Sequence, residues 1–398
     1  MDLLVKLENK LSALFHEKFQ PDKITFKYNF KQLDKLGDFV VKIVNPKCED
    51  FARVDATSLI AEFDDSNGLS ITNAEITDAG VHVFVERNSA YTTFLRTMSE
   101  SYLGLDSNLE KTIKLESDVQ NSTLDLLSLT DLRILSVKTV VNNLLKLNGF
   151  KIQSSEATTS DLHIKISRSS SSNGNNQINL LCGPVVCDRT KAVEYVDKRA
   201  NDMQLIAQHK YGIRVKDNER FKRTISSLGR SAAIVDLLES KISSPIDMRK
   251  ADKNQSSKGA SFILYNYARL SVLFRTFEEK QSKGYYPVLP DIGDVDFGLL
   301  KEEDEWQLFW VYVCGYPSML RHALGDDNLE KMAPHLVLAF ASGLVISLSK
   351  YYRRIRILTE NRSHLLPVMF ARIQLLKVVY RILSTLLDIL DLEPVTQM

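Results

Sequence analysis

From residue 246 to its last residue, 398, the chain carries apolar residues at helical spacing almost throughout. The final helical run shows this most clearly, because its apolar positions form one stripe: Met369, Leu376, Val379, Leu383, Leu386 and Leu390. A helix with such a stripe has to bury it against other helices. Another run covers residues 262–274, and further runs lie between the two. The sequence therefore predicts an all-α bundle over residues 246–398.

Residues 1–110 combine two periodicities instead. Apolar residues near the N-terminus recur at helical spacing: Leu3, Leu7, Leu11 and Leu14. Residues 24–30 and 81–85 alternate between polar and apolar with period two, which is typical of strands with one buried face. The sequence predicts a small α+β module over residues 1–110.

Residues 111–245 mix strand and helix signals in a third pattern. The expected elements are, in order, a strand at 112–115, a helix at 129–147, and strands at 162–166 and 178–182. Asn148-Gly149 is a typical signal for the end of the helix. The polar tract at residues 168–177 cannot bury itself, so we expect a mobile loop there.

Composition restricts the possible functions. A chain of 398 residues is long enough for two or three domains with separate cores. Its formal net charge of +1 gives no overall attraction for nucleic acid, so any such interface has to be local. The four cysteines lack zinc-ligand spacing and the seven histidines do not cluster. We therefore expect no metal, no cofactor and a reduced, cytoplasmic compartment.

We also expect no interaction with a membrane. Residues 1–8 mix charged with apolar side chains, as a short amphipathic helix does and a signal peptide does not. The longest uncharged run, residues 336–349, is too short to cross a bilayer.

A strongly basic segment lies near the C-terminus. It contains a single acid, Glu360, and eight basic residues: Lys350, Arg353, Arg354, Arg356, Arg362, Arg372, Lys377 and Arg381. An apolar stripe passes through its first part: Leu344, Leu348, Tyr351, Ile355 and Leu358. Helical geometry then places Lys350, Arg353 and Arg356 on the opposite side, with Tyr352 at the edge.

Two interpretations of this arrangement are open. A charged side opposite an apolar stripe is usually a solvated helix face. An exposed aromatic ring beside arginines is also what single-stranded RNA recognition uses, because an unpaired base stacks on either group. The lack of interleaved acids favours RNA, since the acids of this region lie in residues 291–305. Arg372 falls in line with the last apolar stripe, so it must be paired or reach a partner.

At several of these positions the chain resembles arginyl-tRNA synthetases, class I enzymes that end in a helical DALR anticodon-binding domain. The matching segments occur in order: Tyr265-Asn266-Tyr267-Ala268-Arg269, Pro334-His335, Tyr352 to Leu358, and Leu387 to Met398. Residues 37–39 and 79–85 are similar to the N-terminal module with which those enzymes contact the tRNA D-loop and elbow. The expected tRNA-binding residues are therefore Tyr352, Arg353, Arg354, Arg356, Arg362, Arg372, Lys377, Arg381, Arg269 and Met398.

The middle of the chain departs from that family. The synthetases carry a His-x-Gly-His signature that stabilises ATP phosphates, whereas this chain has Ser128-Leu129-Thr130-Asp131 at the matching position. Both histidines are missing, and a carboxylate there would repel phosphates. Asp188-Arg189-Thr190-Lys191 is a poor substitute for the Lys-Met-Ser-Lys loop. About thirty residues follow Phe150 before Leu180, too few for a full nucleotide-binding sheet. We therefore expect no catalytic residues and no enzyme activity.

Over nearly its whole length the chain is similar to the DALR anticodon-binding domain-containing protein 3 family. The shared segments are Leu181-Cys182-Gly183-Pro184-Val185, Lys258 to Leu270, Gly284 to Pro287, and Asp296 to Leu300. The resemblance implies that the protein binds particular arginine tRNAs and delivers them to a methyltransferase-like enzyme, which makes 3-methylcytidine in the anticodon loop.

The expected fold is a multidomain α+β chain with three parts. These are an N-terminal α+β module (1–110), a degenerate class I synthetase-like α/β remnant (111–245), and a C-terminal all-α DALR bundle (246–398). Two alternative functions stay open. One is a divergent arginyl-tRNA synthetase-like enzyme, and the other is a protein scaffold without RNA binding.

Overall fold

The computed structural model describes residues 3–29, 32–44, 70–78, 80–100, 103–105, 111–119, 123–153, 160–169, 176–187, 190–211, 219–249, 259–326 and 328–395. The chain forms two compact units, each assembled from three segments. The first, here the N-terminal unit, comprises Met1–Tyr102, Arg275–Tyr316 and Ser347–Val379. The second, here the central unit, comprises Leu103–Phe274, Pro317–Ile346 and Tyr380–Met398. The domain boundaries expected near residues 110 and 245 stay predictions.

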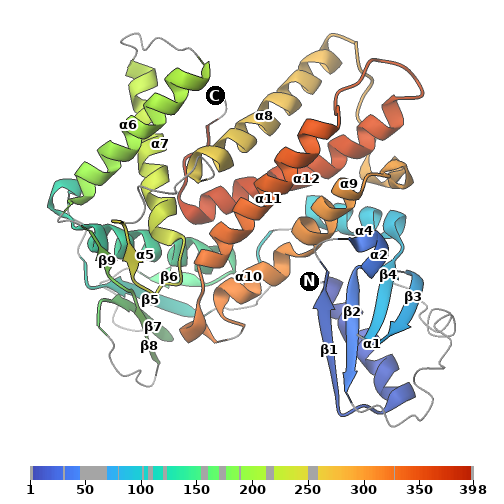
Figure 1. Ribbon diagram of the computed structural model, residues 1–398, viewed down its shortest axis with the longest axis horizontal. Helices are drawn as coiled ribbons and strands as arrows, with labels where there is room; N and C mark the ends of the chain where they lie inside the picture. The colour runs from blue at the N-terminus through green and yellow to red at the C-terminus, as the bar shows by residue number, and fades with distance from the viewer. Residues whose placement is uncertain are drawn as a thin grey trace. The chain divides into compact units, whose positions relative to one another are not determined.

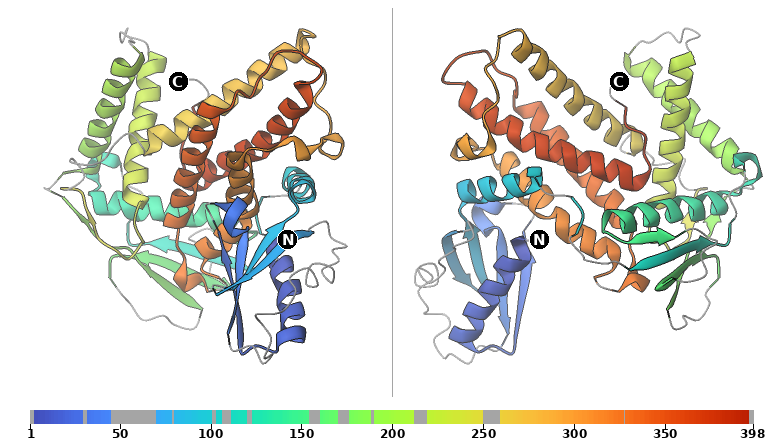
Figure 2. Two further views of the ribbon diagram at one scale, coloured as in Figure 1. Left: turned by 45° about the vertical axis from the view of Figure 1, so that its right-hand side comes forward. Right: turned by 180° about the vertical axis from the view of Figure 1, so that it is seen from behind.

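The N-terminal unit contains a four-stranded antiparallel sheet of order β1-β2-β4-β3 (Figures 1 and 2). Its strands are β1 (Lys23–Tyr28), β2 (Phe39–Val44), β3 (Ile71–Thr77) and β4 (Gly80–Val85). The sheet is accompanied by helices α1 (Leu3–Phe19), α2 (Leu33–Leu36) and α4 (Arg87–Glu100). Helix α1 lies along one face of the sheet and buries Leu4, Leu7, Leu11 and Phe15. The α+β module expected at the N-terminus is confirmed.

Asp38 joins this sheet to a helical segment of the same unit. The indole N–H of Trp306 donates to Oδ1 at 2.6 Å, and the backbone N–H of Val85 donates to Oδ2 at 2.7 Å. The indole of Trp310 donates to the backbone oxygen of Asp38 at 3.2 Å. Trp306 lies on α9 (Glu303–Gln307) and Trp310 on the π-helix η6 (Leu308–Cys314). Burial raises the pKa of Asp38 to about 6, against the lowering effect of these hydrogen bonds.

The central unit contains a parallel sheet of order β6-β5-β7-β8. Its strands are β5 (Thr112–Ser117), β6 (Lys151–Gln153), β7 (Leu162–Ser167) and β8 (Gln177–Leu181). Helix α5 (Leu129–Leu147) lies on one face of the sheet (Figure 2). The buried apolar residues of the strands are Ile113, Leu115, Ile164, Ile166, Ile178 and Leu180. The predicted helix at 129–147 and its end at Asn148-Gly149 are confirmed, with Gly149 at φ 84°.

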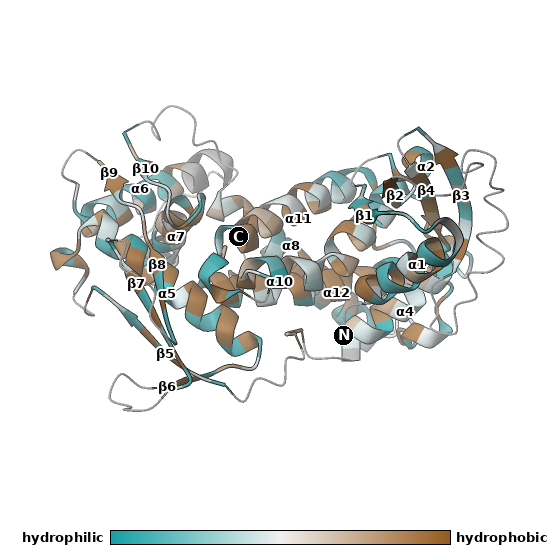
Figure 3. Ribbon diagram, turned by 90° about the horizontal axis from the view of Figure 1, so that it is seen from below, coloured by the Kyte–Doolittle hydropathy of each residue, from teal (hydrophilic) through white to brown (hydrophobic). Residues whose placement is uncertain are grey.

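The opposite face of this sheet is polar. Hydrophilic and hydrophobic residues alternate along β7 and β8 (Figure 3). Two ion pairs lie on the polar face, Lys114–Glu116 and Lys165–Asp118, both at 2.9 Å, and His163 contacts Glu116 at 3.0 Å. Their side chains are 24–39% exposed. Parallel sheets usually bury both faces under helices, so this one is solvated where a second helical layer would lie.

The lengths of the connections within the sheet explain why the described residues form no helical layer on that face. Residues 154–161 join β6 to β7, and residues 168–176 join β7 to β8. A crossover helix between parallel strands needs a dozen residues or more. Neither connection is long enough, which agrees with the sequence-based expectation that a full nucleotide-binding sheet cannot fit. The tract expected to be a mobile loop, 168–177, lies largely outside the described residues.

Arg133 on α5 forms hydrogen bonds with two other segments of the central unit, at Gly183 and at residues 237–244. Its guanidinium is fully buried and donates to the backbone oxygens of four residues and to one hydroxyl: Leu237, Gly183, Ser244, Lys241 and Ser240 Oγ. Gly183 has to be glycine, because a Cβ there would lie 2.6 Å from the backbone of Ser244. The Leu-Cys-Gly-Pro-Val segment found in the sequence is therefore a close-packed joint.

Two further pairs of elements surround this joint. Helices α6 (Ala192–Tyr211) and α7 (Glu219–Leu238) lie side by side as a hairpin (Figure 1). The short strand β9 (Val185–Val186) pairs in parallel with β10 (Ile246–Asp247). A 3-10 turn, η2 (Leu124–Leu126), precedes α5.

The C-terminal part is helical, as predicted. Its helices are α8 (Ala260–Ser282), α10 (Tyr316–Leu324), α11 (His335–Arg354) and α12 (Leu366–Leu390). Short 3-10 turns, η4 (Ile292–Asp294), η5 (Phe297–Leu299) and η7 (Leu329–Lys331), lie in the connections. All six residues of the predicted α12 stripe are fully buried. Pro367 stands at the second position of α12, where its missing N–H leaves no hydrogen bond unmade.

Among the described residues, α11 alone is long and apolar enough to cross a membrane. The helix is longer than the uncharged run at residues 336–349, which was judged from the sequence to be too short to cross a bilayer. Its apolar stripe packs inside the protein, with Val337, Leu344 and Leu348 at most 1% exposed. A core helix of a globular protein meets the same criteria, so the expectation of no membrane partner stays a prediction.

Candidate nucleic-acid interface

The basic segment begins in the last turn of α11. Tyr351 is fully buried, while Lys350, Arg353 and Arg354 are exposed, so the two sides of the helix were assigned correctly up to this point. Arginines in the last turn also stabilise a helix through its dipole. The helix ends at Arg354, which the periodicity did not predict.

The predicted stripe and basic arc are wrong beyond that end. Ile355 and Leu358 are only half-buried, and Ile357 takes the buried position instead. Arg356 therefore follows the helix rather than lying on its arc. Its Nε donates to the backbone oxygen of Leu358 at 3.1 Å, and its side chain is exposed.

Two of the acids of residues 291–305 contact this basic segment. Asp304 on α9 is 6% exposed and bonds two cations of α11. Its Oδ1 lies 2.8 Å from Nζ of Lys350, and its Oδ2 lies 2.5 Å from a guanidinium nitrogen of Arg354. Both cationic side chains are still 56% exposed. The one-sided charge seen in the sequence is thus partly balanced in three dimensions.

A second acid of α9 is the partner that the sequence led us to expect for Arg372. Glu305 is fully buried and accepts a bond from Nε of Arg372 at 2.8 Å and from the hydroxyl of Tyr351 at 3.0 Å. Burial raises the pKa of Tyr351, and the neighbouring Glu305 raises it further, so the phenol stays protonated. The side chain of Arg372 is 15% exposed. Arg372 therefore has its partner within the protein and contributes to the core of the N-terminal unit.

Three of the predicted tRNA-binding residues in this unit stay available to a polyanion. Arg353, Arg356 and Lys377 are exposed and have no acidic partner among the described residues. The Nε of Arg353 donates to the backbone oxygen of Ser349 at 3.3 Å. Arg362 forms an ion pair with Glu360 at 2.7 Å on the surface, where such a pair contributes little to the stability of the fold. Tyr352 is half-buried.

The remaining predicted residues belong to the central unit. Arg269 on α8 and Arg381 on α12 are half-buried there, and Met398 lies outside the described residues. The neighbouring tyrosines of these two helices serve packing. Tyr267 stacks on Tyr380 with ring centroids 4.8 Å apart, and their hydroxyls lie 2.9 Å from each other.

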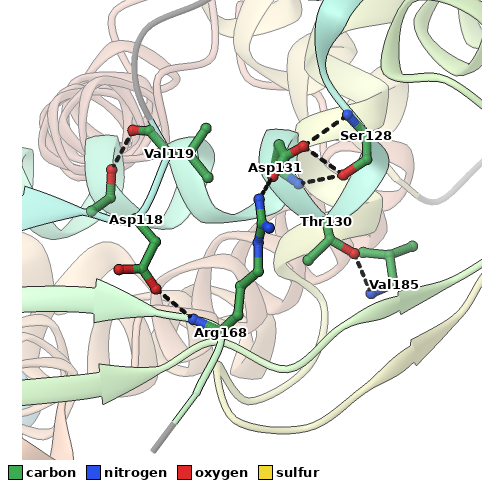
Figure 4. A network of polar contacts seen from close by, with 8 residues as sticks. Asp118, Val119, Ser128, Thr130, Asp131, Arg168 and Val185 are labelled. Atoms are coloured by element: carbon green, nitrogen blue, oxygen red, sulfur yellow. Dashed lines mark hydrogen bonds and ion pairs between the residues drawn. The ribbon is translucent and has the colours of Figure 1, made fainter. Parts of the chain in front are cut away.

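The segment that replaces the synthetase signature forms the N-terminus of α5 (Figure 4). The Ser128 hydroxyl accepts the backbone N–H of Asp131 at 3.2 Å, and the Asp131 carboxylate accepts the N–H and hydroxyl of Ser128 at 3.0 and 2.7 Å. This reciprocal arrangement is a capping box. Thr130 accepts the backbone N–H of Val185 at 3.0 Å, and a guanidinium nitrogen of Arg168 donates to Asp131.

These contacts occupy the N-terminus of α5. A phosphate at a helix N-terminus needs free N–H groups and positive potential. Here Asp131 supplies its own negative charge. Burial alone would raise its pKa, but the hydrogen bonds from Ser128 and the charge of Arg168 outweigh that effect and hold the pKa below the usual range. Arg168, which follows β7, is also held by Asp118, whose carboxylate accepts its backbone N–H at 3.1 Å.

Sequence reasoning missed three residues of these sites. Asp304 and Glu305 were counted among the acids of residues 291–305 and not connected with the basic segment, although an acidic run beside a basic one was a usable signal. Arg168 was not singled out, since nothing in the sequence connects it to Asp131. Lys191 of the poor Lys-Met-Ser-Lys substitute forms a β-bridge with Ser128, whereas residues 188 and 189 lie outside the described chain.

The described residues contain no group of three or more His, Cys, Asp or Glu side chains that could hold a metal ion. Among the described residues, Cys182, Cys187 and Cys314 are free thiols. Burial raises the pKa of the Cys182 thiol, which makes it a poor nucleophile.

Comparison with known proteins agrees with the fold. Residues 263–398 match the family described as DALR anticodon binding domain. DALR anticodon-binding domain-containing protein 3 of Danio rerio is 29% identical over 55% of this chain and 41% of its own length. The Mus musculus protein of that name is 29% identical over 55% of this chain and 43% of its own length. The match thus spans less than half of these relatives.

Among solved structures, the arginyl-tRNA synthetase of Thermus thermophilus aligns with a TM-score of 0.68 at 10% sequence identity, covering 100% of both chains. The chain therefore has an arginyl-tRNA synthetase-like fold with a DALR domain at its C-terminus. These matches confirm the resemblance stated from the sequence over 55% of the chain, not over nearly its whole length.

Proposed function

We propose that this protein is a non-catalytic tRNA-binding adaptor, which recognises arginine tRNAs and presents them to a methyltransferase that forms 3-methylcytidine in the anticodon loop. The match to an anticodon-binding domain and the synthetase-like fold support a tRNA-related function. Arg353, Arg356 and Lys377 would contact phosphates, and unpaired loop bases would supply specificity.

One observation carries the non-catalytic part of the proposal. The N-terminus of α5 is occupied by the Ser128–Asp131 capping box and by Arg168, at the position of the synthetase signature. A nucleotide would have to displace an ion pair and a helix cap to bind there. The solvated face of the parallel sheet supports the same reading, because a nucleotide-binding sheet needs helices on both sides.

The protein itself can be tested for both activities. Purified full-length chain should bind an arginine tRNA transcript, and affinity should fall by about 1.5 orders of magnitude between about 50 and 200 mM salt if three phosphates are contacted. It should give no arginine-dependent ATP–pyrophosphate exchange. Exchange above background would support the divergent-synthetase alternative instead.

The methyltransferase part rests on the resemblance to the DALR anticodon-binding domain-containing protein 3 family. Its test is reconstitution: an arginine tRNA, a tRNA 3-methylcytidine methyltransferase and this chain, with 3-methylcytidine measured by mass spectrometry. Modification that depends on the chain supports the proposal. Equal modification without the chain contradicts it.

The scaffold alternative is favoured by the acids of α9. Asp304 and Glu305 neutralise three side chains of the basic segment: Lys350, Arg354 and Arg372. A scaffold that no longer touches RNA predicts no binding of any tRNA at about 50 mM salt. The salt titration therefore separates the two functions.

A further inference from the structure

Beyond the basic residues, the N-terminal unit presents an exposed aromatic loop where α8 ends. Residues 283–290 follow this helix, and Tyr285 is 43% exposed while Val288 is 83% exposed. Two large apolar groups on one short loop are not needed for the core, because the neighbouring Tyr286 fills that role at 3% exposure. An exposed aromatic ring among cations is a recurring feature of RNA-binding surfaces.

The end of α8 fixes the position of the Tyr285 ring. Gly284 adopts a left-handed conformation with φ 70°, which closes the helix in the manner of a glycine C-cap. The backbone N–H groups of Tyr285 and Tyr286 then donate to the oxygen of Lys280, at 2.8 and 3.2 Å. The side chain of Gln281 donates to the oxygen of Pro287 at 3.0 Å. Residues 285–287 of the loop are thus tied to the last turn of the helix.

A second segment of the unit, residues 359–364, is tied to the two tyrosines. The hydroxyl of Tyr286 donates to the oxygen of Thr359 at 2.5 Å, and the hydroxyl of Tyr285 accepts the N–H of Asn361 at 3.3 Å. The side chains of residues 360–364 are exposed, and they include Arg362 and His364. The Tyr285 ring is therefore oriented by its own hydroxyl and stands beside a polar, solvent-facing turn.

The charges around the ring fit a polyanion. Nζ of Lys280 lies 5.2 Å from the centroid of Tyr285 and 5.3 Å from that of Tyr286, within cation–π distance. Lys283 and Arg362 are also exposed in the two segments, where Arg362 pairs with Glu360, and Glu279 of α8 is exposed as well. A ring held in place loses little entropy when a flat partner stacks on it.

We propose that Tyr285, with the 359–364 turn, is a stacking site for an unpaired nucleobase. The inference rests on the proposed tRNA-binding function and adds a site outside the basic segment of α11. The ligand is an unpaired RNA loop, whose base would stack on the tyrosine while Lys280 and Arg362 face the adjoining phosphates. Stacking of this kind tolerates any base, so Tyr285 contributes affinity rather than sequence choice.

The test compares full-length variants that separate the ring from its hydroxyl. Tyr285→Phe keeps the ring, Tyr285→Leu keeps only apolar bulk, and Val288→Ala is the control on the same loop. Binding of an arginine tRNA transcript is measured by mobility shift at several salt concentrations. Tyr285→Leu should weaken binding about tenfold, whereas Tyr285→Phe and Val288→Ala should stay within about twofold. The salt dependence should not change, because no phosphate contact is lost.

Other results overturn the proposal in distinguishable ways. If Tyr285→Leu binds the transcript like the unmodified chain, the ring does not stack on RNA, although the adaptor function is untouched. If the variant binds tRNA normally but no longer supports methylation by the partner enzyme, the loop is a protein-docking surface. If the unmodified chain binds no tRNA, the stacking site fails together with the proposed function. A circular dichroism melt of each variant excludes loss of folding as the cause.

Discussion

Asp304 bonds Lys350 through one carboxylate oxygen and Arg354 through the other, and is itself 6% exposed. A buried anion thus holds two cations that are 56% exposed to solvent. An RNA phosphate would have to compete with this carboxylate for both. The acid therefore limits how much of the basic helix end is available to a polyanion.

Replacing Asp304 with Asn should strengthen tRNA binding. The change frees Lys350 and Arg354, so we expect affinity to rise about threefold to tenfold at low salt and to fall more steeply with added salt. It should also lower the free energy of unfolding by about 1–3 kcal/mol, because a buried charge-assisted hydrogen-bond pair is lost. Mobility shift and urea unfolding measure the two effects.

Asp326→Asn is the matched control, since it makes the same change in net charge at an exposed position. Affinity should rise little in that variant. Weaker or unchanged binding by folded Asp304→Asn protein would show that Lys350 and Arg354 do not face RNA.

The double change Arg353→Glu with Arg356→Glu should weaken tRNA binding about tenfold or more, and it should lower the salt slope by about two. Both side chains are exposed and bond only backbone oxygens, so folding should be preserved. A filter-binding titration across salt concentrations gives both quantities. Lys301→Glu with Lys331→Glu carries the same charge change at two other exposed positions. Equal weakening in this control would point to net charge rather than to a site.

Asp131→Ala should leave tRNA binding unchanged but lower the free energy of unfolding by about 1 kcal/mol. The reason is that Asp131 completes the capping box of α5 and pairs with Arg168. Thermal and urea unfolding measure the loss. Asp125→Ala is the control, because Asp125 lies on the preceding turn η2 and does not take part in the capping box of α5. A loss of tRNA affinity with Asp131→Ala would mean that this part of the central unit takes part in binding.

Asp38 should make stability depend on pH between about 4 and 7. Its folded pKa of about 6 exceeds the unfolded value near 4, so the native state holds a proton that the unfolded state has lost. Its stabilising contribution is fully present below about pH 4 and is lost as pH rises through 6. Asp38 alone should make the protein about 1 kcal/mol more stable at pH 5 than at pH 7.

Urea unfolding at those two pH values isolates this effect by comparison with Asp38→Asn. The variant should be less stable overall, because one amide hydrogen would face the N–H of Trp306 or Val85. Its stability difference between the two pH values should shrink by about 1 kcal/mol. If the stability difference between the two pH values is the same in Asp38→Asn, a group other than Asp38 takes up the proton.

Much of the fold could be predicted from local patterns. Periodicity alone located α5 and the buried stripe of α12, because those helices present one face to a core and their ends carry ordinary signals. The same method extended the basic arc to Arg356, since nothing in the sequence marks Arg354 as the end of α11. Hydrophobic spacing does not report where a helix stops unless a glycine or proline follows.

The candidate site was less predictable, because it depends on pairs distant in the sequence. Glu305 and Arg372 are 67 residues apart, and Arg168 reaches Asp131 across 37. Each acid was visible, as was each base, but only the fold brings them together. A count of charges along one segment therefore overstates the cations that RNA can reach.

The joint around Gly183 has a consequence for recognising similar chains. A side chain at that position would push against the backbone at Ser244 and pull the guanidinium of Arg133 from its carbonyl acceptors. The Leu-Cys-Gly-Pro-Val stretch thus reflects how this region of the protein is packed. Sequences collected by it will share this way of building the middle of the molecule, whatever nucleic acid or protein each of them holds.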